Sequence, residues 1–365
     1  MPETEVAIIW LNYNSLRFWK IAQRSLMSTS GILCGIRTDV YVVDNASTDG
    51  SYERLCELIS QGVVKNAKTI RSPINTGYAG GNNLGYERLP DSVRYFALMN
   101  NDFLLAPGAL RQLIRVMEEH PEIGAIQGEI LSMEGSIDNC GFKINEALAV
   151  TAVTEPLHEV SYTSGCFSVY RMEAVKKINR HGGLLFEPDF FSYGDDNVLG
   201  LELWEVGYKC VCIDTVAGYH VGRASSKSAF LTFLINRAWV ALIVASDSRF
   251  RALLLYTSFS VVIIGVIRLI VERNPAELPY AIRAWFGGLR LGKKLITKGE
   301  RISLYSAPIE KTSLVQTLFV SFSNQTQALV SRRYLKSRAR KRLWHIPENS
   351  PTMAMTNVEN LDSSL

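Results

Sequence analysis

Along the first 120 positions, short apolar runs alternate with segments in which apolar and polar residues are mixed in a helix-like pattern. Four short apolar runs are rich in strand-forming residues and lie at 5–14, 39–44, 67–71 and 93–99. Four intervening segments have helix-like patterns and lie at about 15–28, 49–60, 78–89 and 106–120. Strands that alternate with helices at such short spacing predict an α/β domain, in which a mostly parallel sheet is covered by helices on both faces.

The pattern loosens after residue 120. The stretches "IGAIQGEIL", "EALAVTAV" and "CFSVYR" have the composition of further strands, some of them antiparallel, and 196–208 has the pattern of a helix. The sequence therefore predicts a mixed, mostly parallel sheet.

Beyond residue 228 the chain becomes more apolar. Residues 229–245 and 252–271 are apolar segments, and the second has 16 residues without a charge before Arg268. A membrane-spanning helix needs about 20 mostly apolar residues, so 252–271 is a borderline candidate. Membrane contact and a buried helix pair both explain these segments. We predict a domain at 1–228, a helical membrane-associated region at 229–345 and a disordered polar tail at 346–365.

Composition and charge narrow the function. The 365 residues carry a net charge of only +4, too little to indicate a nucleic-acid partner. Residues 332–342, "RRYLKSRARKR", hold seven basic residues in eleven, typical of a solvated tail or of a contact with anionic lipid headgroups. The start of the chain lacks the features of a signal peptide, and the six cysteines show no C-x-x-C spacing. We expect a reducing, cytoplasmic setting.

Polar clusters follow the predicted strands. They are Asp44-Asn45, the glycine-rich 75–83, 100–102 "NND", and 193–197 "YGDDN" with 218–226 downstream. In open α/β sheets ligands bind beyond the carboxyl ends of the strands, so these clusters predict a binding site at one edge.

These residues could bind a ligand, and most of them also have a simpler structural explanation. A carboxylate such as Asp44 can accept hydrogen bonds from a base or a ribose. Gly80 and Gly81 allow close approach of the backbone to a phosphate, or simply form a tight turn. Asp102 could bind a divalent cation, although an acid in this position is often a helix cap. His220 could be a second ligand or a structural histidine.

The order of these motifs resembles that of inverting family 2 glycosyltransferases with the GT-A fold, particularly the bacterial and archaeal rhamnosyltransferase-like branch. The resemblance covers about residues 5–228 and does not extend to 229–365. The matching stretches are "VAIIWLNYNS", "VVDNASTDGS", "NTGYAGGNNLGYE", "LMNNDFLLAPGAL", "SGCFSVYRMEAV", "FFSYGDDNVLGLELWEVGYK" and "YHVGRASS".

The resemblance implies specific roles for these residues. The acid that ends the second strand, Asp44, would contact the base and ribose. Asp102 would hold Mg²⁺ or Mn²⁺ with His220, and Asp196 would be the general base with Asp195 beside it. The residues implied in nucleotide-sugar binding are Asn12, Asp44, Asn45, Gly77, Gly80, Gly81, Asn82 and Asn101.

The implied reaction moves a sugar from a nucleoside-diphosphate sugar, dTDP-rhamnose or a UDP-sugar, to a hydroxyl. The apolar and basic C-terminal region favours a glycan or polyprenyl-diphosphate-linked acceptor at the cytoplasmic face of the cell membrane.

Three positions depart from the family pattern. The first metal-motif position is Asn100, and Val198 and Glu202 stand where a third acid and an arginine are usual. They leave open a non-catalytic sugar-nucleotide-binding partner of another transferase. A nucleotidyltransferase is a further alternative, but "WLNYNSLRFWK" lacks the glycines such an enzyme would need.

Overall fold

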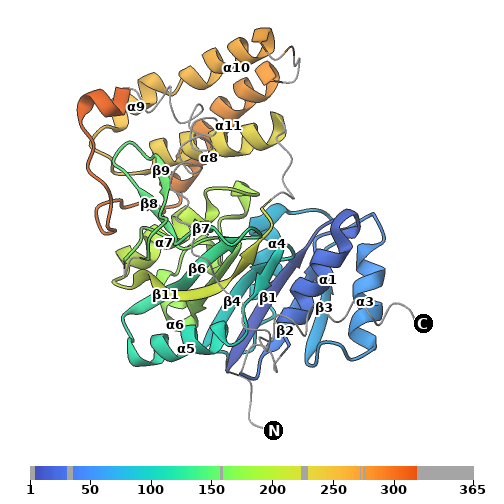
Figure 1. Ribbon diagram of the computed structural model, residues 1–365. Coiled ribbons are helices and arrows are strands. Elements are labelled where there is room, and N and C mark those ends of the chain that lie inside the picture. Colours follow the sequence, from blue (N-terminus) through green and yellow to red (C-terminus); the bar gives the residue numbers. More distant parts are fainter. Residues whose placement is uncertain are drawn as a thin grey trace. The chain divides into compact units, whose positions relative to one another are not determined.

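A mixed sheet organises the first two thirds of the chain (Figure 1). The computed structural model describes residues 5–30, 36–156, 159–222, 229–271, 273 and 277–318. Within these residues nine strands join in the order β3-β2-β1-β4-β10-β6-β11-β5, with β7 paired to β6, and β8 and β9 form a separate hairpin. The strands are β1 (Val6–Asn12), β2 (Asp39–Asp44), β3 (Ala67–Arg71), β4 (Tyr95–Asn100), β5 (Phe103–Leu105), β6 (Ile123–Ser132), β7 (Ile137–Asn139), β8 (Phe142–Ile144), β9 (Val150–Ala152), β10 (Phe167–Arg171) and β11 (Lys209–His220).

Strands β1 to β4 pair in parallel, whereas β10 runs antiparallel to both β4 and β6. The mixed, mostly parallel α/β fold with C-terminal helices is therefore confirmed. The predicted strands at 39–44 and 67–71 coincide with β2 and β3, but only three residues of "EALAVTAV" form a strand, β9.

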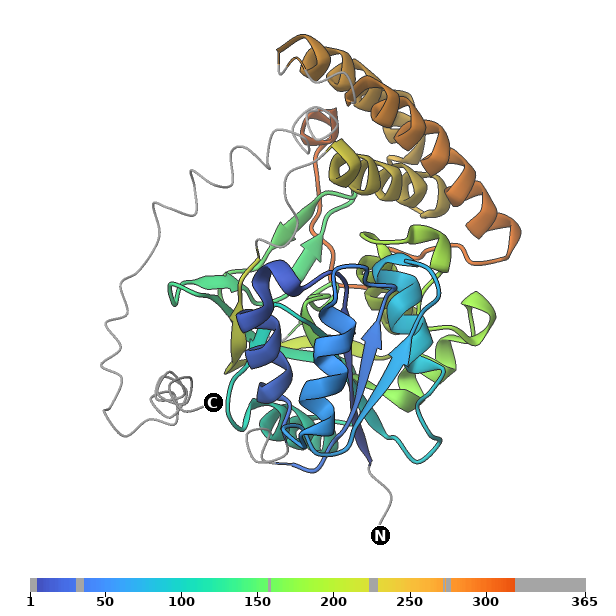
Figure 2. The ribbon, with the colours of Figure 1, turned by 90° about the vertical axis from the view of Figure 1, so that its right-hand side faces the viewer.

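Helices cover both faces of the sheet, and Figure 2 shows α1 and α3 side by side in front of it. Successive residues of β1 alternate between the two cores: Val6, Ile8 and Trp10 pack with α1, α3 and α5, and Ala7 and Ile9 pack against the other face. This two-sided burial explains the uninterrupted apolar runs of the sequence. The covering helices are α1 (Trp19–Ser28), α3 (Ser51–Ser60), α4 (Gly77–Tyr86), α5 (Ala109–Glu119), α6 (Met172–Ile178) and α7 (Asp195–Glu205).

Four further helices lie together beyond the sheet (Figure 1). They are α8 (Ala229–Ala245), α9 (Arg251–Thr257), α10 (Ser260–Val271) and α11 (Glu277–Thr297). Helix α11 packs closely on α8, because a side-chain carbon at Gly288 or Gly292 would lie only 2.6 Å from the Arg237 or Ala241 carbonyl oxygen. The helices share a core with Val198 and Leu201 of α7.

The apolar segment 252–271 is divided between two helices. Helix α9 ends at Thr257 and α10 begins at Ser260. At the break, Ser258 Oγ donates to the Leu255 carbonyl at 2.6 Å and accepts a hydrogen bond from Trp285 Nε1 of α11 at 3.0 Å. Such side-chain bonds compete with helical ones, which explains why the chain bends here.

No helix among the described residues has both the length and the hydropathy that crossing a membrane requires. The basic stretch 332–342 and the tail 346–365 lie outside the described residues. The boundary at 228 stays a prediction.

Candidate functional site

The carboxyl ends of β1, β2 and β4 meet at one edge of the sheet. Strand β1 lies between β2 and β4, and the register places Asn12 opposite Asp44 and Leu11 opposite Asn100. The strand order reverses between β1 and β4, and such a switch point is where α/β sheets bind ligands. The fold thus brings together Asn12, Asp44, Asn101 and Asp102, as the sequence predicted.

Asp44 lies at the centre of a buried hydrogen-bond network. Its Oδ1 accepts from Asn12 Nδ2 at 2.9 Å, and its Oδ2 accepts from the Ser47 backbone N–H at 3.0 Å. Arg71 Nε lies 3.7 Å from Oδ2, and Asn101 Nδ2 donates to Asn12 Oδ1 at 3.0 Å. Protein groups therefore engage both carboxylate oxygens and fix the turn after β2. A contact between Asp44 and a nucleotide stays a prediction.

Asn45 connects the end of β2 to the start of α4. Its Nδ2 donates to the Gly77 carbonyl at 2.8 Å, and its Oδ1 accepts from the Thr76 backbone N–H at 3.0 Å. On α4, buried Asn82 donates to the Tyr78 carbonyl at 3.0 Å, but its Oδ1 has no partner among the described residues. A buried acceptor without a donor is costly, so Asn82 Oδ1 is a candidate contact for a ligand.

The glycines of α4 allow close packing. A side-chain carbon on Gly77 would lie 2.1 Å from the Phe191 carbonyl oxygen, and one on Gly81 would lie 2.5 Å from Leu11 Cδ1. One on Gly80 would lie 2.4 Å from the side chain of Thr76. These glycines therefore place α4 against β1 and against the loop that holds Phe191. Whether they also contact a nucleotide stays a prediction.

An open pocket of about 560 Å³ lies beyond the end of β1. This volume falls within the range of small-molecule sites. Asn14 Oδ1 accepts from the Thr48 backbone N–H at 2.9 Å, and Asp49 Oδ2 accepts from Leu16 at 2.8 Å, so two loops are fixed together. Asn14 and Asp49 are not among the residues predicted for the site, although Asn14 ends the first predicted strand and Asp49 begins the helix that follows the second. The lining residues are Tyr13, Asn14, Leu16, Arg17 and Asp49.

Asp102 and His220 lie together although 118 positions separate them. Strand β11 pairs with β5 so that His220 lies opposite Phe103, and His220 Nε2 is 3.5 Å from Asp102 Oδ1. The other ring nitrogen, Nδ1, lies 3.3 Å from Oδ2 of Asp138 in β7. Asp138 could not be predicted from the sequence, because its proximity to His220 depends on how β6 pairs with β7 and β11.

The donor set of this centre suits a divalent cation. Carboxylate oxygen and imidazole nitrogen are both ligands for Mn²⁺, whereas Mg²⁺ prefers oxygen alone. A histidine ligand commonly donates its second ring N–H to a carboxylate, as Asp138 allows here. Burial lowers the pKa of His220, but Cys166, Asp102 and Asp138 raise it by more, so the net shift is upward. Asp102 and Asp138 place negative charge on both sides of His220, and that charge would also attract a cation.

Asp195 and Asp196 are adjacent acids in the first turn of α7, where Asp195 is buried and Asp196 is half-buried. Burial, and then the charge of Asp196, raises the pKa of Asp195. Burial also raises the pKa of Asp196, although backbone hydrogen bonds from Asn197 and Gly165 oppose the shift. Asp195 Oδ2 has no hydrogen-bond partner among the described residues. Asp196 is thus the member of the pair that ionises more readily.

The segment Gly165-Cys166 links this acid pair to the strand ends. A side-chain carbon on Gly165 would lie 3.2 Å from Asp196 Oδ2, and the Gly165 carbonyl accepts from the Tyr78 hydroxyl at 2.6 Å. The next carbonyl, that of Cys166, accepts from the Asn100 backbone N–H at 3.0 Å. The acid pair, α4 and the end of β4 therefore surround one region of the molecule.

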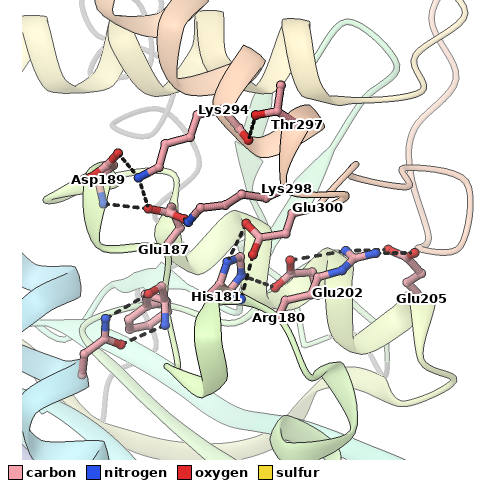
Figure 3. Close-up of polar contacts among 12 residues, drawn as sticks. Arg180, His181, Glu187, Asp189, Glu202, Glu205, Lys294, Thr297, Lys298 and Glu300 are labelled. Carbon is pink, nitrogen blue, oxygen red and sulfur yellow. Dashed lines mark hydrogen bonds and ion pairs between the residues drawn. The ribbon is translucent and has the colours of Figure 1, made fainter.

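A second histidine centre lies between α7 and α11 (Figure 3). His181 Nε2 is 3.0 Å from Glu202 Oε2, and Nδ1 is 3.2 Å from Glu300 Oε2. Burial lowers the pKa of His181, but Glu202, Glu300 and Glu187 raise it by more. Because the net shift is upward, the imidazolium is favoured here.

Basic residues balance the remaining charge of this centre. Glu187 lies 3.1 Å from Lys294 Nζ and 2.6 Å from Lys298 Nζ, and Lys294 also pairs with Asp189. Burial raises the pKa of Glu187, but the two lysines outweigh it and the net shift is downward. Figure 3 shows these side chains converging from α11 and from the loop before α7.

The two departures on α7 have structural explanations. Val198 is buried in the core that α7 shares with α8. The carboxylate of Glu202 is engaged by His181 and by Arg180, whose Nη1 lies 3.4 Å from Oε1. Glu202 thus belongs to the second histidine centre.

Solved structures share this architecture. The chain matches S. aureus TarS residues 1–349 with a TM-score of 0.53 at 14% identity, covering 93% of each chain. The match to a longer TarS structure covers 93% of this chain but only 56% of that one. The mannosyltransferase PcManGT from Pyrobaculum calidifontis, in complex with GDP-Man and Mn²⁺, matches with a TM-score of 0.50 at 15% identity, covering 94% of this chain and 88% of that one. GalNAc-T7 with UDP, GalNAc and Mn²⁺ matches with a TM-score of 0.50 at 11% identity, covering 82% and 59%.

At these identities the likeness shows the fold, which is the GT-A fold of glycosyltransferases. Residues 8–178 match the family model of glycosyl transferase family 2, and residues 95–276 match that of glycosyl transferase family group 2. The two matches together extend from residue 8 to residue 276, and the chain belongs to glycosyltransferase family 2.

Proposed function

We propose that this glycosyltransferase moves a sugar from a nucleoside-diphosphate sugar to a hydroxyl of a lipid-linked or cell-surface glycan, with inversion at the anomeric carbon. One observation carries the proposal. The Asp102–His220 centre and the half-buried acid Asp196 approach the same region, joined through Gly165-Cys166. A cation-binding pair and a base are the two groups that this transfer requires.

The donor would bind along the switch point of the sheet. The pocket beyond β1 supports a place for the base and ribose near Asn14 and Asp49. Asn82 Oδ1 is an additional acceptor on α4. Asp102 and His220 would hold Mn²⁺ in preference to Mg²⁺, and the bound cation offsets the charge of the diphosphate. dTDP-rhamnose and UDP-sugars are our first choices of donor, and the GDP-Man complex of PcManGT adds GDP-sugars.

Asp196 is the base in this proposal. Its carboxylate takes the proton of the acceptor hydroxyl, whose oxygen forms a bond to the anomeric carbon as the bond to the diphosphate breaks. The nucleoside diphosphate leaves from the opposite side. In this proposal Asp195 stays protonated, because burial and the charge of Asp196 raise its pKa, and Asp196 carries the negative charge of the pair.

We place the reaction at the cytoplasmic face of the cell membrane. The support is the composition of the chain after residue 228, where apolar helices precede the basic stretch 332–342. A polyprenyl-diphosphate acceptor would present its hydroxyl to the enzyme at that surface.

The first experiment is a donor screen with purified protein. UDP-, dTDP- and GDP-sugars are incubated with Mn²⁺, Mg²⁺ or EDTA, and nucleoside diphosphate release and thermal shift are recorded. We expect Mn²⁺-dependent release with one nucleotide. Binding without turnover, together with unchanged cellular glycan in an Asp196→Asn strain, would instead support the non-catalytic partner.

The pH dependence of kcat tests the assignment of the base. Activity requires ionised Asp196, and burial raises the pKa of this residue, so kcat should fall with decreasing pH at a midpoint well above the ordinary Asp value of about 3.9. Asp196→Asn should lower kcat by about 10²- to 10⁴-fold. Asp195→Asn keeps the shape of the pair and should leave the acidic limb in place. If Asp195→Asn abolishes the limb instead, Asp195 is the base.

A further inference from the structure

Helix α10 carries an apolar stripe that faces away from the protein. Its exposed large side chains recur every three or four positions and therefore lie on one side of the helix. Their exposed fractions range from 39% for Val266 to 70% for Ile270. The stripe consists of Phe259, which directly precedes α10, and of Ile263, Val266, Ile267 and Ile270.

The exposed apolar surface continues onto α11, which runs beside α10 (Figures 1 and 2). The ring of Phe259 lies 5.4 Å from that of Trp285, which lies 5.0 Å from that of Phe286. Phe286 is 52% exposed and Ile282 is 39% exposed. Soluble proteins rarely expose a large contiguous apolar surface, and such a surface commonly marks a site that binds another protein or a membrane.

Basic side chains accompany these apolar groups. Arg283, Arg290 and Lys293 are exposed on α11. Residues 251–297 contain seven basic and two acidic residues, and the acids are Glu272, directly after α10 in the sequence, and Glu277, the first residue of α11. An apolar face bordered by cations and almost free of acids is complementary to an anionic lipid surface.

The charge also argues against a second copy of the chain on this face. Two copies would bring like charges together as the apolar stripes met, which is unfavourable at a desolvated interface. A lipid bilayer supplies both apolar depth and negative headgroups. The basic stretch 332–342 would add to the same attraction.

We propose that the α10 stripe and the exposed side of α11 form a docking face that lies in the interface of an anionic membrane. The name docking face refers to Phe259, Ile263, Val266, Ile267, Ile270, Ile282, Arg283, Phe286, Arg290 and Lys293. This inference rests on the proposed function, since a lipid-linked acceptor would then reach the enzyme from the surface on which it docks.

Vesicle flotation with the full-length protein tests the docking face. Wild type should float with phosphatidylcholine vesicles that contain phosphatidylglycerol, and less with phosphatidylcholine alone. The double variant Ile267→Glu/Ile270→Glu should bind at least about tenfold more weakly, because two apolar side chains no longer insert. Arg290→Glu/Lys293→Glu should lose binding to the anionic vesicles by a similar factor, and added salt should weaken wild-type binding.

Matched control variants make the same kinds of substitution at exposed residues outside the docking face. Met133→Glu replaces a side chain that is 52% exposed in the β6–β7 turn, and Arg111→Glu/Arg115→Glu reverses two exposed charges on α5. Both should float like wild type. Circular dichroism and release of nucleoside diphosphate from donor alone, without vesicles, should be unchanged in Ile267→Glu/Ile270→Glu.

Three outcomes would overturn the docking face. One is wild type that binds neither vesicle. Another is vesicle binding that survives Ile267→Glu/Ile270→Glu but is lost when the basic residues of 332–342 are neutralised. The third is an oligomer that this double variant dissociates, with no vesicle binding, which would assign the face to a second copy. Failure of donor turnover with intact flotation would instead reject the proposed function and leave the docking face standing.

Discussion

Two histidines of this enzyme each lie between two carboxylates, yet their surroundings differ. His220 lies between Asp102 and Asp138 beyond the strand ends, where its side chain is 19% exposed. His181 lies between Glu202 and Glu300 with only 2% of its side chain exposed. The local motif is therefore the same in chemistry but not in access to solvent.

The cations around each centre explain the difference in role. Near His181, Arg180, Lys294 and Lys298 pair with the surrounding acids, so the charge is balanced by protein groups. Among the described residues, no lysine or arginine forms an ion pair with Asp102 or Asp138. We therefore propose the His220 centre as the one that takes a cation, whereas the His181 centre connects α7 to the end of α11.

Geometry alone would not separate the two. His181, Glu187 and Glu300 place ligand atoms within 4.8 Å of one another, which is close enough for a metal ion. What decides against a metal there is competition, since Glu187 is held by two lysines and His181 by two carboxylates. A carboxylate that is already neutralised is a poor ligand.

The largest expected effect comes from replacing one carboxylate by an amide, first at the His220 centre and then at the His181 centre. Asp102→Asn should remove the Mn²⁺-dependent thermal shift and lower transfer at least about a hundredfold, because a cation contributes several kcal/mol to stabilising a departing diphosphate. Glu300→Gln makes the same carboxylate-to-amide change at the His181 centre and should keep the Mn²⁺ response. Mn²⁺ titration followed by thermal shift and by activity measures both.

The opposite result would reverse the assignment. If Glu300→Gln abolishes the Mn²⁺ response and Asp102→Asn does not, the metal lies at His181 and the centre at His220 is structural.

The His181 centre should contribute to stability. His181→Asn keeps a residue that tolerates the positive φ of 55° at this position but leaves Glu202 and Glu300 buried without the imidazolium. We expect the free energy of unfolding to fall by about 3–5 kcal/mol. The pKa of His181 is raised in the folded state, so its stabilising contribution is complete below the ordinary value of about 6.5 and is lost as pH rises through the raised value.

Urea unfolding at several pH values measures this contribution. The difference between wild type and His181→Asn should shrink as the solution becomes alkaline. His120→Asn is the control, because the His120 side chain is 54% exposed and should change stability by less than about 1 kcal/mol. A difference that is constant with pH would show that His181 acts as a neutral hydrogen-bond partner.

The two centres also show which site residues can be predicted from the sequence and which cannot. Asp44, Asp102 and Asp196 could be selected because each ends a strand, follows one or opens a helix, which are local signals. Asp138 and Glu300 could not, because they reach their histidines across 82 and 119 positions. Likewise, the division of 252–271 depends on Ser258 meeting Trp285 of another helix.

The smallest effect should come from Asp138, the second carboxylate beside His220. Asp138 orients His220 through Nδ1, and loss of such a partner weakens metal binding by about 10- to 100-fold. We expect the lower end of this range for Asp138→Asn, because the Asp138 side chain is 45% exposed and water can replace it. The readout is the Mn²⁺ concentration at half-maximal thermal shift. Asp91→Asn neutralises a fully exposed acid paired to Lys176 and should leave that concentration unchanged. A loss as large as that of Asp102→Asn would instead make Asp138 a direct ligand, and no change would restrict the centre to Asp102 and His220.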